Sequence, residues 1–368
     1  MFEMSNPSSR LYSVQALRAI AALLVVIYHA TEATLRNVRS GGEYSAALIL
    51  DIAWLGNVGV DIFFVISGFI MVYAHFDHFG KSGSPIRFLV KRLIRIVPNY
   101  WLLTIFAGII IFFAPHFSQH GREAEIPWIF ASLLFIPWTS AAGIPVPIIG
   151  LGWTLNFEMY FYVIFSIALI FKRRSAIRGL TLFFIMSIAF GYVFDYKNTF
   201  LSQATHWLLA EFLLGIFLGL AFKNGKSISN KLGVVLITVS CVLMALALMF
   251  KADGTLLPIL RLALFGGSAA CLVACLTLTP LSHKLHFPRL ILLLGNASYS
   301  LYLTHVFTLP ATLFGFQYLP FYLSGWIIIV LLVIISIIVG VIFYTLIEKP
   351  IQQFIQVYLS LRTKKIAI

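Results

Sequence analysis

The chain of 368 residues is 60% hydrophobic and only 11% charged. Soluble domains carry roughly 25% charged residues, so this composition excludes a soluble globular protein and predicts a chain that crosses a membrane many times. The formal net charge of +13 does not indicate a nucleic-acid partner, because the basic residues gather in short loops between apolar runs. They form no stripe of interleaved basic and aromatic residues of the kind that binds nucleic acid.

The apolar runs predict about ten spans of roughly 20 residues each, the length that crosses a bilayer. The predicted spans lie near 14–31, 53–74, 97–114, 150–171, 179–194, 205–222, 232–250, 257–279, 290–312 and 322–347. The apolar stretch 127–138 is too short to cross, and we expect a re-entrant or interfacial element there. The fold class is therefore all-α and polytopic, with one transmembrane domain over residues 1–350 and a short basic cytoplasmic tail at 351–368.

The basic residues are distributed unequally over the two sides that these spans define. One side takes both termini and the basic loops 75–96, 172–178, 223–231 and 280–289. The other side carries Arg36, Arg39, Arg122, Lys197 and Lys251. Since cytoplasmic loops carry the excess of lysine and arginine, we expect both termini in the cytoplasm.

The first span contains an arginine and a histidine, Arg18 and His29, eleven residues apart. Eleven residues at about 100° each return to nearly the same face of a helix, about 16 Å farther along its axis. Ionisable residues within a membrane helix are costly and usually functional. Each side chain alone is also compatible with an interfacial position, Arg18 as a snorkelling anchor, but a lipid-facing stripe is not expected to carry both.

The second predicted span contains Asp61, Ser67 and Gly68. It runs from the outside inward, so Asp61 enters the membrane on the side where His29 ends. A carboxylate there can accept a hydrogen bond from one imidazole nitrogen and raise the basicity of the other. We interpret Ser67 and Gly68 first as close-packing residues, with a substrate contact by Ser67 as the alternative.

Three basic residues, Lys91, Arg92 and Arg95, precede the third span at its cytoplasmic boundary. Arg92 and Arg95 are three residues apart and project together from a helix, and Pro98 is expected to start a new helix. A pair of guanidinium groups suits a polyanion such as a phosphate. The alternative is ordinary anchoring on the phosphates of membrane lipids.

Two later spans contain further candidates for a site. Glu158 lies about two turns inside the outer boundary, where an unpaired carboxylate is costly, and its expected partner is His29 or an arginine. Trp153 precedes it by five residues and is typical of the interfacial aromatic belt. His305, in the ninth span, is a candidate for a second site residue.

The remaining embedded polar residues are interpreted as structural. Glu211 and Arg261 are expected to form an ion pair with each other. The cysteines at 241, 271 and 275 lie inside apolar runs and show no metal-ligand spacing, so we interpret them as core residues and expect no metal site.

Taken in order, these segments resemble the membrane-bound acyltransferase-3 family, and the first spans resemble its exopolysaccharide-production branch. Members of the family O-acylate sugars of exopolysaccharides, O-antigens and related acceptors. The matching features are Arg18 with His29, the Ser67–Gly68–Phe69 step, Arg92 and Arg95 followed by Pro98 and Tyr100, Trp153–Thr154–Leu155 with Glu158, Tyr302–Leu303–Thr304–His305, and Glu348–Lys349–Pro350.

The resemblance implies transfer of an acyl group, usually acetyl, from acyl-CoA to a hydroxyl, with acetyl-CoA as a donor substrate and no permanently bound cofactor. Arg92 and Arg95, with Lys91 and Arg18, then hold the CoA phosphates. His29 acts as general base, oriented by Glu158 or Asp61. A transient acyl-histidine is the alternative role of His29. The acceptor contacts are assigned to Ser67, Trp153 and His305.

The expected partners are acyl-CoA, a saccharide acceptor that is free or lipid-linked, and membrane lipids, and the expected location is a bacterial inner membrane. Two other function classes compete with this one. A transporter or flippase of a lipid-linked saccharide would use Arg18, His29, Asp61 and Glu158 as a polar pathway. In a non-catalytic sensor or assembly partner, the same charges would be structural pairs.

Overall fold

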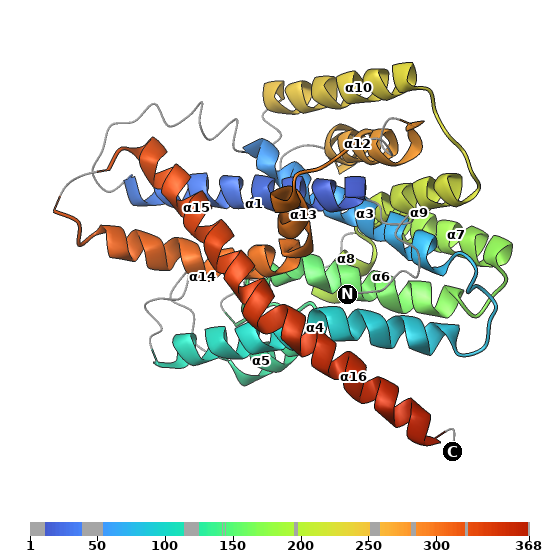
Figure 1. The fold of residues 1–368 in the computed structure, drawn as a ribbon, viewed down its shortest axis with the longest axis horizontal. Coiled ribbons are helices and arrows are strands. Elements are labelled where there is room, and N and C mark those ends of the chain that lie inside the picture. The colour runs from blue at the N-terminus through green and yellow to red at the C-terminus, as the bar shows by residue number, and fades with distance from the viewer. Residues whose placement is uncertain are drawn as a thin grey trace. The chain divides into compact units, whose positions relative to one another are not determined.

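The computed structural model describes residues 12–38, 54–113, 125–141, 143, 145–194, 198–250, 258–280, 285–320 and 323–366. Within these ranges the chain is helical and contains no β-strand (Figure 1). The predicted all-α class is confirmed. Of the basic residues assigned to the sparsely charged side, Arg39, Arg122, Lys197 and Lys251 lie outside the described residues.

The chain forms two compact units, each built from separate stretches of sequence. The first unit consists mainly of residues 75–209 and 345–368, and the second of residues 2–74 and 210–344. The helices of the first unit are α4 (Ser84–Phe113), α5 (Ile126–Leu133), α6 (Gly152–Ala168), α7 (Arg173–Val193), α8 (Thr199–Ala204) and α16 (Lys349–Ile366). Those of the second unit are α1 (Tyr12–Val38), η2 (Leu55–Asn57), α3 (Val58–His75), α9 (Leu209–Lys223), α10 (Asn230–Met249), α11 (Pro258–Arg261), η4 (Leu262–Gly266), α12 (Gly267–Leu278), α13 (Arg289–Asn296), α14 (Ser298–Phe316) and α15 (Gly325–Phe343).

Eight helical stretches of the described chain are long and apolar enough to cross a membrane. They are Tyr12–Arg36, Leu55–His75, Ser84–Phe113, Arg173–Val193, Thr199–Lys223, Asn230–Met249, Ile259–Leu278 and Gly325–Leu359. The pair α13 and α14, bent by 73° at the break between them, makes a ninth if it is one span. The remaining predicted span corresponds to α6, whose 17 residues stand at the lower limit of the usual length.

Two local expectations can be compared directly with the helices. The prediction that Pro98 starts a helix is wrong, because Pro98 lies inside the continuous helix α4. Proline inside a membrane helix is tolerated where neighbouring groups satisfy the backbone carbonyl that it leaves free. The helix in the stretch 127–138 is α5, which begins at Ile126, has eight residues and is too short to cross.

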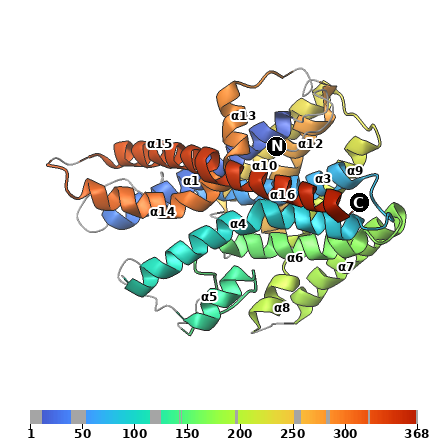
Figure 2. The ribbon, with the colours of Figure 1, turned by 60° about the horizontal axis from the view of Figure 1, so that its bottom comes forward.

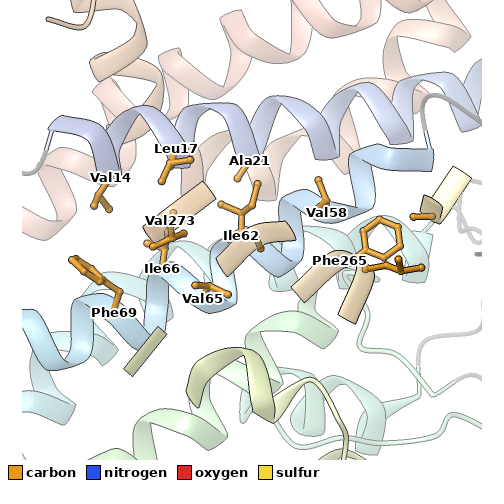
Figure 3. Packing of buried hydrophobic residues seen from close by; sticks show 13 residues of the cluster. Val14, Leu17, Ala21, Val58, Ile62, Val65, Ile66, Phe69, Phe265 and Val273 are labelled. Atoms are coloured by element: carbon orange, nitrogen blue, oxygen red, sulfur yellow. The ribbon is translucent and has the colours of Figure 1, made fainter. Parts of the chain in front are cut away.

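The core of the second unit lies mainly between α1, α3 and α12 (Figure 3). Val14, Leu17 and Ala21 of α1 face α3, which contributes Ile62, and Val273 of α12 belongs to the same buried cluster. A membrane supplies no hydrophobic drive between helices, so their association depends on close packing of small residues.

Glycines allow α3 to approach both of its neighbours closely. A Cβ on Gly59 would lie 2.4 Å from the carbonyl oxygen of Ala21 in α1, and one on Gly68 would lie 2.1 Å from that of Phe212 in α9. Both distances are too short for real atoms, so these two positions require glycine. Gly68 therefore supports the close-packing interpretation of the Ser67–Gly68 step.

The helix α1 also packs against α13, α14 and α15, which come from the far end of the sequence (Figure 2). Gly340 brings α15 against α14, because a Cβ there would lie 2.8 Å from the Cα of Leu301. These contacts place the polar residues of α1 beside those of α14.

The first unit is held by packing of α4 against α5, α6 and α16, and of α7 against α6. Its core is aromatic: Phe88 of α4 lies 5.9 Å from Tyr162 and 5.2 Å from Phe165 of α6, measured between ring centroids. The predicted basic tail 351–368 forms part of α16 as far as Ile366.

Candidate active site

His29 and His305 lie together in the second unit, one on α1 and the other on α14. Their ring centroids are 5.1 Å apart and the rings are tilted by 45°. His305 is completely buried, while His29 is half-buried. The structure thus brings together two of the predicted site residues that are 276 positions apart in the sequence.

Each of the two imidazoles is oriented by a carbonyl of its own helix. His29 Nδ1 lies 2.9 Å from the carbonyl oxygen of Val25, and His305 Nδ1 lies 3.0 Å from that of Leu301. A carbonyl only accepts hydrogen bonds, so both Nδ1 atoms carry a proton, and in the neutral rings both Nε2 atoms then have a lone pair available. Among the described residues, the buried Nε2 of His305 has no hydrogen-bond partner.

Arg18 lies on α1 next to the break between α13 and α14. Its Nη2 donates a hydrogen bond to Ser298 Oγ, the first residue of α14, at 2.8 Å. Ser298 is fully buried, whereas Arg18 is half-buried. Its Nη1 also donates to Gln15 Oε1 at 3.4 Å, so the protein holds Arg18 at two nitrogens while part of its side chain remains accessible.

Asp61 forms an ion pair with Arg261, at 2.9 Å between Oδ1 and Nη1. Asp61 is completely buried, and Arg261 directly precedes the π-helical turn η4, an element often found at functional sites. We expected Arg261 to form its ion pair with Glu211, but the residue that it bonds to is Asp61. Glu211 is buried beside this ion pair, close enough to interact with both Asp61 and Arg261.

In the first unit, Arg92 lies buried among the side chains of α4 and α6. Its guanidinium carbon lies 5.8 Å from the centroid of Phe88 and 5.6 Å from that of Tyr162. The hydroxyl of Tyr162 donates a hydrogen bond to Oε1 of Glu158, which lies four residues earlier on α6. Glu158 and Arg92 are near enough to interact electrostatically, so the expected arginine partner of Glu158 is present.

The other predicted residues of these two units lie as follows. Lys91 is exposed and Arg95 is half-buried, so the cations of α4 differ in accessibility instead of forming one solvated patch. Trp153, in the first turn of α6, is half-buried with its ring centroid 5.9 Å from that of Phe157. Ser67 is buried within α3. No group of three or more histidine, cysteine or acidic residues that could hold a metal ion occurs in the described part of the chain.

Sequence reasoning missed two residues that contact the predicted site groups. Tyr162 was detectable, because it follows Glu158 by four residues and so shares its helix face. Ser298 was not detectable, because only the packing of α1 on the α13–α14 break brings it to Arg18.

The described residues are helical and include at least eight candidate spans, which makes the chain a multi-pass membrane protein, and one of its units brings two imidazoles together. Residues 11–345 match the acyltransferase-3 family model, which describes an acyltransferase domain, and the chain belongs to this family. The predicted enzyme class, an acyltransferase, is confirmed.

Three relatives illustrate the range of similarity. The chain is 31% identical to the exopolysaccharide production protein ExoZ of Rhizobium meliloti over 318 residues, 81% of this chain and 90% of ExoZ. It is 29% identical to the acyltransferase MdmB of Streptomyces mycarofaciens over 46% of this chain and 42% of MdmB. It is 25% identical to the O-acetyltransferase OatA of Staphylococcus aureus over 92% of this chain but only 57% of OatA. No solved structure matches the chain.

Proposed function

We propose that the protein transfers an acetyl group from acyl-CoA to a hydroxyl of a cell-surface or exopolysaccharide sugar, with His29 as general base. Membership of the acyltransferase-3 family supports acyl transfer. The similarity to an exopolysaccharide production protein and to O-acetyltransferases supports acetyl as the group and a saccharide as the acceptor.

The observation that carries the role of His29 is its hydrogen bond to Val25. Because Nδ1 donates to that carbonyl at 2.9 Å, Nε2 is the unprotonated nitrogen of the neutral ring. A neutral imidazole fixed in this tautomer can take the proton of an acceptor hydroxyl as the oxygen attacks the thioester carbonyl. The carbon–sulfur bond then breaks, and the CoA sulfur receives the proton.

For the donor, we propose that cations bind the phosphates of CoA. Lys91 and Arg95 are the accessible candidates on α4, and Arg92 contributes positive charge from a buried position. On α1, Arg18 precedes His29 by eleven residues, about 16 Å along a helix, which is comparable with an extended pantetheine arm.

The carboxylates are assigned roles that agree with their contacts. Asp61 is held by Arg261, and Glu158 accepts from Tyr162 beside Arg92. We therefore propose that both carboxylates hold cations in place and that the Val25 carbonyl orients His29. Ser67 and Trp153 are proposed acceptor contacts, and the completely buried His305 is proposed to act on the acceptor side through its neighbour His29.

The proposal places the protein in the inner membrane of a bacterium with both termini in the cytoplasm, and the acceptor sugar is free or lipid-linked. Support comes from the concentration of basic residues in alternate loops, which is the pattern of cytoplasmic loops. The cations of α4 then lie on the side where cytoplasmic acyl-CoA arrives.

The test uses purified full-length protein, acetyl-CoA labelled in its acetyl group, and de-O-acetylated surface polysaccharide from the producing organism. We expect base-labile label in the polysaccharide with the wild type and with H78A, which alters an exposed histidine. The variant H29A should lose transfer by about 10²- to 10⁴-fold, the usual contribution of a general base. Wild-type rates in H29A would disprove its role, and saccharide movement across vesicles without use of acetyl-CoA would favour a transporter.

A further inference from the structure

The buried face of α14 carries an imidazole nitrogen that the proposed reaction has not yet used. His305 Nε2 is inaccessible to solvent and has no hydrogen-bond partner among the described residues, although Nδ1 of the same ring is bonded to Leu301. Leaving a buried hydrogen-bond acceptor unpaired costs about 1–3 kcal/mol. We therefore expect His305 Nε2 to gain a hydrogen-bond partner during the reaction.

The nearest such partner is the ring of His29, whose centroid is 5.1 Å away. The other charged groups that act on His29 are Glu32 and Arg36 of its own helix, and these two bind each other at 2.5 Å. Two buried carboxylates are described in the same unit: Asp61 is paired with Arg261, and Glu211 interacts with that pair. His305 is the residue of α14 whose ring lies beside that of His29, and no hydrogen bond joins the two rings in this resting structure.

Protonation of His29 is energetically costly, and a second imidazole beside it can lower that cost. When His29 takes the hydroxyl proton, a positive charge forms on a ring within a membrane-embedded unit, where an unpaired charge is costly. In many enzymes a carboxylate stabilises the imidazolium. Here the Nδ1 proton of His29 is already bonded to the neutral carbonyl of Val25.

We propose that His29 and His305 form a proton-sharing pair: once Nε2 of His29 has taken the proton of the acceptor hydroxyl, its Nε2–H donates a hydrogen bond to Nε2 of His305, and the pair holds that proton until the CoA thiolate takes it up. This inference rests on the proposed function. The oxygen–hydrogen bond of the acceptor breaks as its oxygen bonds to the acyl carbon, and the electron pair of the carbon–sulfur bond leaves with sulfur. The shared proton then completes the thiol, and both imidazoles return to the neutral state.

In this scheme His305 is a positioning residue, because it acts on the reaction through His29. Sharing spreads one positive charge over two rings and lowers the cost of forming it in the transition state. In this scheme the charge forms only as the hydroxyl proton is removed, so substrate affinity does not depend on it. Loss of His305 should therefore lower kcat and leave KM for acetyl-CoA unchanged.

The experiment compares H305Q, H305A and T308V with the wild type in the labelled acetyl-CoA assay. Thr308 is a buried residue of α14 whose hydroxyl bonds to Thr304 of the same helix, so T308V controls for disturbance of the helix. We expect kcat of H305Q and H305A to fall by about 10²-fold, the lower end of the contribution of a positioned proton acceptor. Added imidazole should restore kcat in H305A, and T308V should keep the wild-type kcat.

A second measurement avoids any question of folding because it uses the wild type alone. Rates in mixtures of H₂O and D₂O should give a curved proton inventory, since two proton positions change in the rate-limiting step. A wild-type kcat in H305Q, or a linear inventory together with no imidazole rescue, would overturn the pair while leaving the acetyl transfer intact. A wild type that never labels the acceptor would overturn the proposed function and the pair together.

Discussion

Arg18 donates a hydrogen bond to Ser298 at 2.8 Å, across 280 positions of sequence and at the point where α13 and α14 are bent by 73°. The bond ties the first helix of the chain to the start of the helix that carries His305. It also fixes one end of a guanidinium group that we assign to the phosphates of CoA.

The variant S298A should reveal what this bond does. A hydrogen bond to a charged group contributes about 1.5–3 kcal/mol, so S298A should lower the melting temperature measured in detergent. If Arg18 binds the donor, S298A should also raise KM for acetyl-CoA more than it lowers kcat. An unchanged KM would indicate that Arg18 is only a structural anchor, and S300A, a buried serine two residues along α14, is the control.

The ion pair of Asp61 with Arg261 should be important for stability. Removing one partner leaves an uncompensated buried charge and costs about 3–5 kcal/mol, so R261Q should lose much of its thermal stability. The double variant with Asp61→Asn and Arg261→Gln should recover most of the loss, because no unpaired carboxylate remains at 61. The melting temperatures of the single and double variants are measured in detergent. A double variant as unstable as R261Q would contradict this account.

The hydroxyl of Tyr162 should be coupled to Arg92 through Glu158. The variant Y162F keeps the ring beside the guanidinium but removes the donor to Glu158. A double-mutant cycle of Y162F with R92K should give an interaction energy within the range of about 0.5–3 kcal/mol found for residues in one network. Y160F alters another tyrosine of the same helix, whose ring lies against Phe200, and should show no coupling to R92K.

The predicted membrane orientation can be tested with single cysteines in a chain whose native cysteines are replaced by serine. A cysteine at Lys226, in a basic loop, should react with an impermeant maleimide only after the cells are opened. A cysteine at the exposed Asn198 should react in intact cells. The reverse pattern would place the basic loops outside and invalidate the route proposed for acyl-CoA.

The sequence was sufficient for properties that depend on one helix at a time. Apolar length predicted the helices, and the spacing of Arg18 and His29 predicted two polar residues on one face of α1. The i, i+4 relation of Glu158 and Tyr162 was equally readable. These features need only the period of the helix and the length of an apolar run.

The contacts between helices could not be predicted in the same way. Arg261 lies 200 positions from Asp61, and no local pattern indicates that this acid, and not Glu211, receives its hydrogen bond. The approach of His305 to His29 likewise depends on how α1 packs on α14. Such partners are set by glycine contacts and side-chain shapes that a hydrophobic pattern does not record.

The position of α1 has a consequence for biosynthesis. Along the sequence this helix comes well before its partners α13, α14 and α15, which begin at Arg289. Until those helices are made, Arg18 lacks Ser298 and His29 lacks His305, so the growing chain must hold two polar groups in the lipid or beside an insertion factor. Truncations that end before α13 should therefore be targets of membrane quality control, and synthesis of α13 to α15 becomes the step that commits the protein to its active form.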